Sequence, residues 1–490
     1  MRRRLTLWVL ASLAPGVGLA FGGCGSTSSS SSSSNEAPHG DESSSGSSGQ
    51  GVFLPSSDGS EEGNGSSSGG SSSGGSSSGG PTGNPLDASL DEFCAGGGGI
   101  PLPSVDGGAS ECAGDIANRV FNFAICACDN LTFNNALRTE SIDSRQDAGL
   151  TSAGASVGVN GTFGANNVVD VSGSLWSKGN ATASNGALEI SFDWISGGNI
   201  SSAGGSVARD VRLAGSLSTS GSGLTIGGNL RMPAGQSAPS GYAAIRQDEA
   251  VSVNAPCNCD TPVDVGSIVA ALTQTNDNTT RDVSPSALSG NSFDVSLDCG
   301  RYYFDSLSST GTATLRLRGR TVVAIAGNVT IANDFSIQLD PMAELDLFIG
   351  GNVTFNGAPS IGDPSRPFAT RIYVAGTSVT SAGKLDVAAN IYAPYAHLQL
   401  NNAVELRGAM FAKSFTFAGA TKVTYDEAIL DTQGCNEPAR KCASCSDCGN
   451  PTPACKGDGT CGPCTSDAQC CAPLVCNVSS GRCIQPAIVK

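Results

Sequence analysis

A repeat of about 19 residues near the C-terminal end constrains the fold more than any other feature of this chain. Residues 371–389, 390–408 and 409–427 align so that apolar residues recur at equivalent positions. The aligned sets are Ile372/Ile391/Met410, Tyr373/Tyr392/Phe411, Val374/Ala393/Ala412, Val379/Leu398/Phe417, Leu385/Val404/Val423 and Val387/Leu406/Tyr425. One repeat of this length cannot bury its own apolar side chains, whereas stacked repeats bury them in one continuous column.

The same phase extends upstream with longer spacing. Tyr302, Val323, Leu347 and Ile372 stand 21, 24 and 25 residues apart, and the segments are rich in turn-forming Gly and Asn. Short alternating strands of this kind predict a mainly β fold, a right-handed parallel β-helix with coils of about 19–25 residues. A leucine-rich repeat has a similar length, but its Leu-x-x-Leu-x-Leu frame is missing. We assign residues 134–434 to the β-helix.

Residues 257–280 interrupt the strand pattern. Val265, Ile268, Val269 and Leu272 have helical spacing, and Asp264 precedes them as an N-cap. We therefore expect a helical insertion that lies across the β-helix or plugs its flank. Its attachment points would be the nearby Cys257, Cys259 and Cys299.

The N-terminus has the pattern of an export signal. Residues 2–4 are arginines, residues 5–21 are mostly apolar, and the run is too short and too interrupted by Gly and Pro to span a membrane. The ending Ala20-Phe21-Gly22-Gly23-Cys24 resembles a bacterial lipobox, which implies a lipoprotein signal peptide over 1–23 and lipidation of Cys24. Gly18-Leu19-Ala20 offers ordinary signal peptidase an alternative site. Residues 24–90 are Ser/Gly low complexity and predict a disordered tether.

Composition fits an exported surface protein. Only 14% of residues are charged, and the net charge of −16 argues against nucleic acid as a partner. Nineteen cysteines in an exported chain indicate disulfides, and setting Cys24 aside leaves an even number. The cysteines expected in disulfides are Cys94, Cys112, Cys126, Cys128, Cys257, Cys259, Cys299, Cys435, Cys442, Cys445, Cys448, Cys455, Cys461, Cys464, Cys470, Cys471, Cys476 and Cys483.

Two cysteine-containing regions flank the expected β-helix. Residues 91–133 have helical spacing at Ile116, Val120 and Phe121, followed by Cys126-Ala127-Cys128, and we expect a helical cap held by disulfides. Residues 435–490 form a cysteine-rich module, which must depend on disulfides because it is small. Its ending, QCCAPLVCNVSSGRC, resembles knottin, colipase and Dickkopf-type modules.

The cysteine counts on the two sides of residue 430 are both odd once Cys24 is set aside. Seven cysteines lie between 94 and 299, and eleven lie between 435 and 483. If every thiol is paired, at least one disulfide must join the two groups. Cys435 is the best candidate on the C-terminal side. Cys299 has no close cysteine neighbour among the seven, although the sequence alone does not fix the partner.

Several short motifs could indicate chemistry, and each has a simpler interpretation. CGPC (461–464) copies the thioredoxin tetrapeptide but lacks its flanking strand and helix. Cys442, Cys445 and Cys448 have zinc-ligand spacing but no nearby histidine, so we expect disulfides and no bound metal or cofactor. GASVG (154–158) matches the nucleophile elbow, yet a turn and a strand follow it instead of a helix.

Carboxylates and histidines decide whether an enzyme is plausible. The best acidic cluster is Asp340, Glu344 and Asp346, where Asp346 should face outward as a solvated surface acid. The chain has two histidines, His39 in the tether and His397 beside a coil, where we expect a surface ladder residue. A carbohydrate-active enzyme, a polysaccharide lyase or hydrolase, is therefore the alternative and not the favoured hypothesis.

From about Cys257 to Leu430 the chain resembles a family of bacterial surface β-solenoid domains found in lipoproteins and attached to pilus-assembly proteins. The segments that carry the resemblance are CGRYYFDSL (299–307), GRTVVAIAGNVTI (319–331), NIYAPYAHLQL (390–400) and GAMFAKSFTFAGATKVTYDEAI (408–429). The coils also resemble the polymer-forming bactofilins, which implies end-to-end self-association. The resemblance implies an outer-membrane lipoprotein at the cell surface, with a structural or adhesive role toward matrix, glycan or pilus, and no catalytic residue.

Overall fold

The computed structural model describes most of the chain between residues 111 and 432. Described residues are 94, 101–102, 111–145, 154–185, 187–236, 239–240, 242, 245–246, 251–432, 442, 444–445, 448, 454–456, 461–462, 464–471, 474–477 and 482–484. The expected signal peptide, Cys24, the tether and Cys435 lie outside them. Among the described helices, none is long and apolar enough to cross a membrane.

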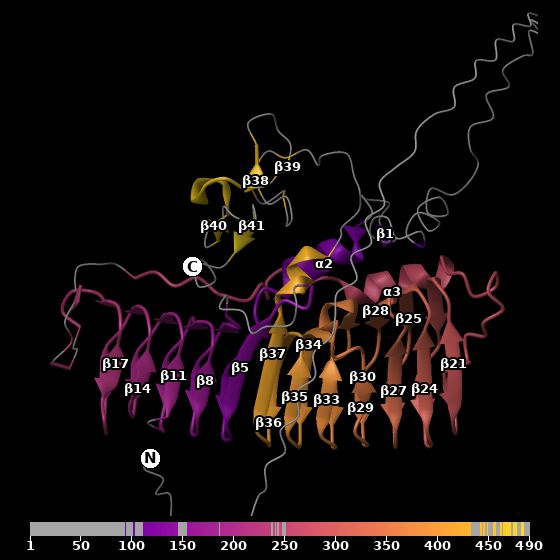
Figure 1. The fold of residues 1–490 in the computed structure, drawn as a ribbon, viewed down its shortest axis with the longest axis horizontal. Helices are drawn as coiled ribbons and strands as arrows, with labels where there is room; N and C mark the ends of the chain where they lie inside the picture. The colour runs from indigo at the N-terminus through magenta and orange to yellow at the C-terminus, as the bar shows by residue number, and fades with distance from the viewer. Residues whose placement is uncertain are drawn as a thin grey trace, which may run out of the picture. The chain divides into compact units, whose positions relative to one another are not determined.

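The described chain is a parallel β-solenoid, which confirms the predicted fold class. One face is a sheet of 12 strands, shown in Figure 1 as a row. In spatial order these strands are β21 (Phe293–Leu297), β24 (Ala313–Leu317), β27 (Phe335–Leu339), β30 (Ser360–Ile361), β33 (Leu385–Ala388), β35 (Val404–Arg407), β37 (Thr421–Asp426), β5 (Leu137–Ile142), β8 (Val169–Val171), β11 (Leu188–Ile190), β14 (Gly205–Val207) and β17 (Leu224–Ile226).

The remaining solenoid strands form two further ladders that merge in β34 (Asn390–Leu400) and β36 (Met410–Phe417). The first contains β22 (Gly300–Phe304), β25 (Arg320–Ile325), β28 (Glu344–Ile349), β31 (Thr370–Val374), then β3 (Ile125–Ala127), β6 (Val157–Val159), β9 (Leu175–Ser177), β12 (Trp194–Ser196), β15 (Val211–Leu213), β18 (Leu230–Arg231) and β19 (Ile245–Arg246). The second contains β20 (Ser289–Gly290), β23 (Leu307–Ser309), β26 (Val329–Ile331), β29 (Val353–Phe355), β32 (Ser378–Ser381), then β4 (Leu131–Phe133), β7 (Phe163–Ala165), β10 (Ala181–Ala183), β13 (Ile200–Ser202) and β16 (Leu217–Thr219).

The order of coils along the solenoid is a circular permutation of their order in the chain. The C-terminal solenoid half (289–432) comes first in space, and its last strand, β37, pairs with β5 of the N-terminal solenoid half (125–231). Met410 likewise pairs with Ile125. Two coils therefore stack at this joint without being consecutive in the chain. The return segment (232–288) carries the chain back to the far end of the C-terminal half.

The predicted repeat is confirmed on all three faces between its first two copies, and on two of the faces it is wrong by two residues at the third copy. Tyr302, Val323, Leu347, Ile372, Ile391 and Met410 do form one ladder. However, Leu398 pairs with Phe415 instead of Phe417, and Val404 pairs with Thr421 instead of Val423. The register shifts between Ala393 and His397. Pro394 lies in this bulge, where its missing N–H interrupts the ladder.

The solenoid has an internal apolar column and a second apolar layer on its outer surface. Leu347, Ile372 and Ile391 line a purely apolar internal cavity of about 40 Å³. Their neighbours along each strand point outward, yet Phe348, Tyr373, Tyr392 and Phe411 are also buried. Ring centroids in this outer ladder lie 4.7 Å apart for Phe348–Tyr373 and 4.8 Å apart for Tyr392–Phe411. The alternation of buried and exposed side chains along each strand is therefore lost on this face, because helices cover it.

Helices α2 (Ala113–Val120) and α3 (Val265–Gln274) run beside the strands (Figure 1). The expected helix in 257–280 is confirmed: Asp264 accepts a hydrogen bond from the Ser267 N–H, and Val265, Ile268, Val269 and Leu272 are buried. Helix α3 contacts β22, β25 and β28. The Tyr392 hydroxyl accepts a hydrogen bond from the Val263 N–H at 3.0 Å, and burial raises the pKa of Tyr392 to about 12.

The range 91–133 contains more than the expected helical cap. Helix α2 lies within it, and β1 (Pro101–Leu102) pairs antiparallel with β2 (Glu111–Cys112). Strands β3 and β4 also fall inside this range and belong to the first coil of the N-terminal half. The solenoid thus begins at residue 125, nine residues before the expected boundary.

The short elements outside the solenoid strands are 3-10 turns and small hairpins. The 3-10 turns are η1 (Pro367–Ala369), η2 (Glu427–Asp431) and η4 (Asp467–Gln469). In the cysteine-rich region, β38 (Ala454–Cys455) pairs with β39 (Cys461–Gly462), and β40 (Val475–Asn477) pairs with β41 (Arg482–Ile484). Among the described residues of this region, the disulfides are Cys442–Cys455, Cys445–Cys471, Cys448–Cys461, Cys464–Cys476 and Cys470–Cys483.

Candidate functional site

An uncharged row of hydroxyl side chains follows the second ladder along both solenoid halves. We call it the hydroxyl stripe. It consists of the outward middle positions of successive strands, in spatial order Ser308, Thr330, Thr354, Thr380, Gln399, Thr416, Thr132, Gly164, Thr182, Ser201 and Ser218. Nine of these eleven positions carry a hydroxyl group, and neighbouring strands of a sheet repeat every ~4.8 Å. The stripe is therefore a regular array of donors and acceptors.

The stripe continues across the joint between the halves. Phe417 pairs with Phe133, so Thr416 and Thr132 stand next to one another although 284 residues separate them. The two phenylalanine rings stack inside the solenoid with centroids 4.7 Å apart. Neither half presents the full stripe by itself.

Asparagines hold the turns beside the stripe in register. Asn328 Oδ1 accepts the Asn352 N–H at 2.8 Å, and Asn352 Oδ1 accepts the Thr377 N–H at 2.9 Å. In the N-terminal half, Asn130, Asn180 and Asn199 accept N–H groups of the following coil in the same way. Each bond satisfies a backbone donor at the turn, which holds the turns of neighbouring coils together.

His397 lies beside the stripe, as expected for a surface ladder residue. Its Nδ1 is 2.9 Å from Ser414 Oγ, and its Nε2 is 3.1 Å from Thr416 Oγ1. Both ring nitrogens are thus engaged by hydroxyl groups.

Charged side chains gather instead on the 12-stranded sheet, where they form ion pairs between coils. Arg316 Nε lies 3.1 Å from Asp294 Oδ1, and Lys384 Nζ lies 2.9 Å from Glu405 Oε2. The 12-stranded sheet is therefore charged, with ion pairs between its coils, whereas the hydroxyl stripe is neutral.

Of the acidic cluster expected as solvated surface acids, Asp340 is exposed, whereas Glu344 and Asp346 belong to a partly buried ion-pair network. Asp346 does point out of the solenoid, but it is buried and paired with Arg371 on the next coil. Arg371 also contacts Glu344, which lies beside Arg320. Although burial acts in the opposite direction, the charges of Arg371 and Arg320 hold the pKa of Glu344 below its ordinary value. No local pattern around Asp346 predicts this burial, because the covering layer comes from elsewhere in the chain.

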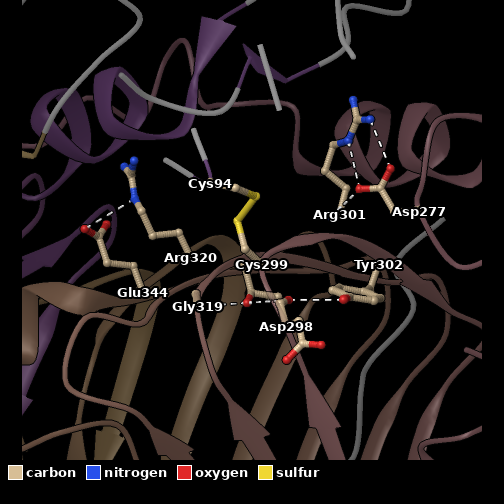
Figure 2. The surroundings of a disulfide bond; sticks show 10 residues. Cys94, Asp277, Asp298, Cys299, Arg301, Tyr302, Gly319, Arg320 and Glu344 are labelled. Carbon is tan, nitrogen blue, oxygen red and sulfur yellow. Dashed lines mark hydrogen bonds and ion pairs between the residues drawn. A yellow bond between two sulfur atoms is a disulfide. The ribbon is translucent and has the colours of Figure 1, made fainter. Parts of the chain in front are cut away.

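A disulfide joins the segment before α2 to the first coil of the C-terminal half. Cys94 is bonded to Cys299, which lies between β21 and β22 (Figure 2). The suggestion that Cys299 pairs across residue 430 is therefore wrong. The adjacent Arg301 is buried, and its Nη2 lies 3.2 Å from Asp277 Oδ1, while its backbone N–H donates to Asp277 Oδ2 at 2.8 Å.

Two parallel disulfides attach the return segment to the first coil of the N-terminal half. Cys126 is bonded to Cys257 and Cys128 to Cys259, so two Cys-x-Cys sequences lie in register. Asn160 adds two hydrogen bonds, donating to the Cys257 carbonyl at 2.8 Å and accepting its N–H at 2.9 Å. Cys112 is also disulfide-bonded, and no described cysteine is its partner.

The motifs that suggested chemistry have structural roles here. Cys461 and Cys464 of CGPC are bonded to Cys448 and Cys476, not to each other. The sulfur clusters Cys442/Cys448/Cys461 and Cys464/Cys470/Cys476 arise from adjacent disulfides, which leaves no thiolate for zinc. Ser156 of GASVG is buried and accepts the Ser174 N–H at 3.0 Å.

Comparison with known proteins finds a family model that matches part of the chain. Residues 245–432 match a family model described as a domain of unknown function, DUF7305. The match covers the C-terminal solenoid half and the later part of the return segment, and it ends before the cysteine-rich region. No curated protein and no solved structure matches the chain.

Proposed function

We propose that this protein is a lipid-anchored structural or adhesive protein of the bacterial cell surface, and that the hydroxyl stripe contacts a neutral glycan. The stripe is the observation that carries the proposal. It is long, regular and uncharged in a chain whose net charge is −16. A neutral polyol needs donors and acceptors at regular intervals and no counter-charge, which the Ser, Thr and Gln side chains of the stripe supply.

The cross-links support a location outside the cytoplasm. Disulfides persist in oxidising compartments, and here they join Cys94 to the C-terminal half and the return segment to the N-terminal half. The export pattern before Cys24 agrees with this location, and acylation at Cys24 would hold the protein at the outer membrane. The stripe has many equivalent weak contacts, which suits repeated binding to a polymer more than capture of one small molecule.

The test is a glycan and matrix binding screen of the folded ectodomain with and without EDTA. Binding to a neutral polysaccharide that survives EDTA would support the proposal. Binding only to anionic polymers, or only with calcium, would contradict the role of an uncharged stripe.

Matched variants then locate the surface. Thr330→Lys and Thr182→Lys place a charge on the exposed stripe in either half. Ser360→Lys and Thr225→Lys place the same charge on exposed positions of the 12-stranded sheet. We expect the first pair to lower glycan binding at least tenfold and the second pair to leave it unchanged. Equal effects of both pairs would exclude the stripe.

A further inference from the structure

The position of the Cys94–Cys299 bond determines which part of the protein carries tension when the chain is pulled from its N-terminal end. This bond closes a loop of sequence separation 205, which contains the entire N-terminal solenoid half and the return segment up to the first coil. A force applied to the chain before Cys94 therefore has a covalent route to Cys299 that bypasses this loop. The strands of the C-terminal half from β22 onward follow directly after that point.

We propose that the Cys94–Cys299 disulfide passes tension from the N-terminal segment into the first coil of the C-terminal half and keeps the N-terminal half out of the tension path. The inference rests on the proposed function in one respect: it takes the N-terminal side of Cys94 as the attached end. A solenoid pulled from one end loses its coils one at a time, because each coil contacts only its neighbours. The bypass protects the coils between residues 125 and 231 from this loss.

Contacts around Cys299 strengthen the part of the first coil into which the Cys94–Cys299 bond would pass tension. Figure 2 shows Arg301 held by Asp277 on one side and Arg320 facing Glu344 on the other. The Tyr302 hydroxyl donates to the Asp298 carbonyl at 3.1 Å. Gly319 of the next coil lies so close that an added Cβ would stand 2.9 Å from Cys299 Cβ. Side chains from two coils and from the return segment thus secure the backbone around the bond.

The two parallel disulfides form a second, inner bypass within the loop closed by Cys94–Cys299. This inner bypass carries no tension while the outer bond is intact. Cys126–Cys257 and Cys128–Cys259 each span 131 residues within the larger loop. While Cys94–Cys299 is intact, they lie off the tension path and serve only to hold the return segment on the joint. If the Cys94–Cys299 bond is missing, the inner disulfides still bypass 131 of the 205 residues.

Single-molecule stretching of the whole ectodomain measures this route. One handle is attached at the N-terminal end of the tether and the other at residue 342, where Met342 is 84% exposed and can be replaced by a residue with a clickable side chain. Cys112→Ser is introduced into every protein compared, including the one called wild type, so that the disulfide of Cys112 offers no other covalent route. In the Cys94→Ser/Cys299→Ser variant, the bypass then shrinks from 205 to 131 residues. The fully stretched length should therefore grow by 74 residues, or about 250 Å.

The matched control removes the inner bonds. The variant with Cys126, Cys128, Cys257 and Cys259 all replaced by Ser should stretch to the wild-type length, because its outer bond is intact. A wild-type length for the Cys94→Ser/Cys299→Ser variant, or an equal gain in the control, would overturn the proposal. If a variant fails to fold, reductant added to stretched wild-type protein should release 205 residues, about 700 Å in total, and no release would overturn it.

The result is separable from the proposed function. The length measurement uses no ligand and no membrane, so it can succeed even if the ectodomain binds no glycan. Conversely, glycan binding that depends on the stripe would stand even if stretching revealed a different route.

Discussion

The Arg371 guanidinium joins two carboxylates of the preceding coil, with Nε 2.6 Å from Asp346 Oδ1 and Nη2 2.9 Å from Glu344 Oε2. Burial of Arg371 acts against its charge, yet the two carboxylates raise its pKa well above the ordinary value. The pairing links β28 and β31 beneath the outer layer, where an unpaired charge would be costly.

Removing this arginine should destabilise the C-terminal half strongly. Arg371→Met leaves Asp346 buried without its partner, and breaking a buried pair in this way costs about 3–5 kcal/mol. The control Arg316→Met breaks the exposed pair with Asp294, which should cost no more than about 1 kcal/mol. Urea unfolding followed by circular dichroism measures both. Comparable losses in the two variants would contradict the buried network.

Stability should decrease in acid because of Glu344. Its folded-state pKa lies below the ordinary value of 4.5, so its contribution is fully present above pH 4.5 and is lost as the pH falls through the folded-state pKa. Asp426 acts in the opposite direction, because burial raises its pKa despite hydrogen bonds from Ser144, Ala428 and Phe368. Comparing Glu344→Gln with wild type isolates the first effect. We expect a smaller acid-induced drop in the urea midpoint for Glu344→Gln, and an unchanged drop would refute this assignment.

Charges inside and outside the coils should have opposite consequences. Leu398→Asp or Phe417→Asp buries a carboxylate in an apolar column, and the cost of several kcal/mol should abolish folding. Gln399→Asp and Thr416→Asp change exposed neighbours in the same strands and should be tolerated. Soluble yield and circular dichroism distinguish the two sets, and similar behaviour in both would mean that the inward and outward assignments fail.

The anchor prediction concerns Cys24. Cys24→Ser removes the thiol that would receive the diacylglycerol, so the protein should remain uncleaved or be released from the membrane. Globomycin should likewise cause the precursor to accumulate. Detergent-phase partitioning settles the matter: if Cys24→Ser partitions as the wild type does, the protein is not a lipoprotein.

One disulfide should still cross residue 430, with a different partner from the one first expected. Seventeen of the 19 cysteines are described and disulfide-bonded, and the sixteen outside Cys112 form eight mutual pairs. If Cys24 carries lipid, Cys112 has only Cys435 available. Non-reducing peptide mapping should therefore recover a Cys112–Cys435 peptide. A free Cys435 thiol would disprove it.

Much of the fold could be predicted from sequence because it depends on local pattern. Each coil places inward residues by simple alternation, so the ladder from Tyr302 to Met410 follows from spacing alone. Helix α3 follows from its apolar spacing and from Asp264, whose carboxylate caps the nearby N–H groups. The two-residue slip after Ala393 was missed because a proline bulge adds residues without changing the composition of the coil.

The tertiary structure alone decided the order of the coils and the environment of the charges. Every coil edge offers the same backbone donors and acceptors, so the sequence cannot say that β37 stacks on β5 and not on a following coil. The sequence could not pair Cys299 with Cys94 either, because that bond depends on which distant segments lie side by side in the fold. Asp346 points outward, as alternation requires, but whether an outward residue meets water depends on which distant segment covers it. Here the return segment and the helices cover that face, so the side chains beneath them are buried. Asp346 therefore forms a buried ion pair instead of facing water.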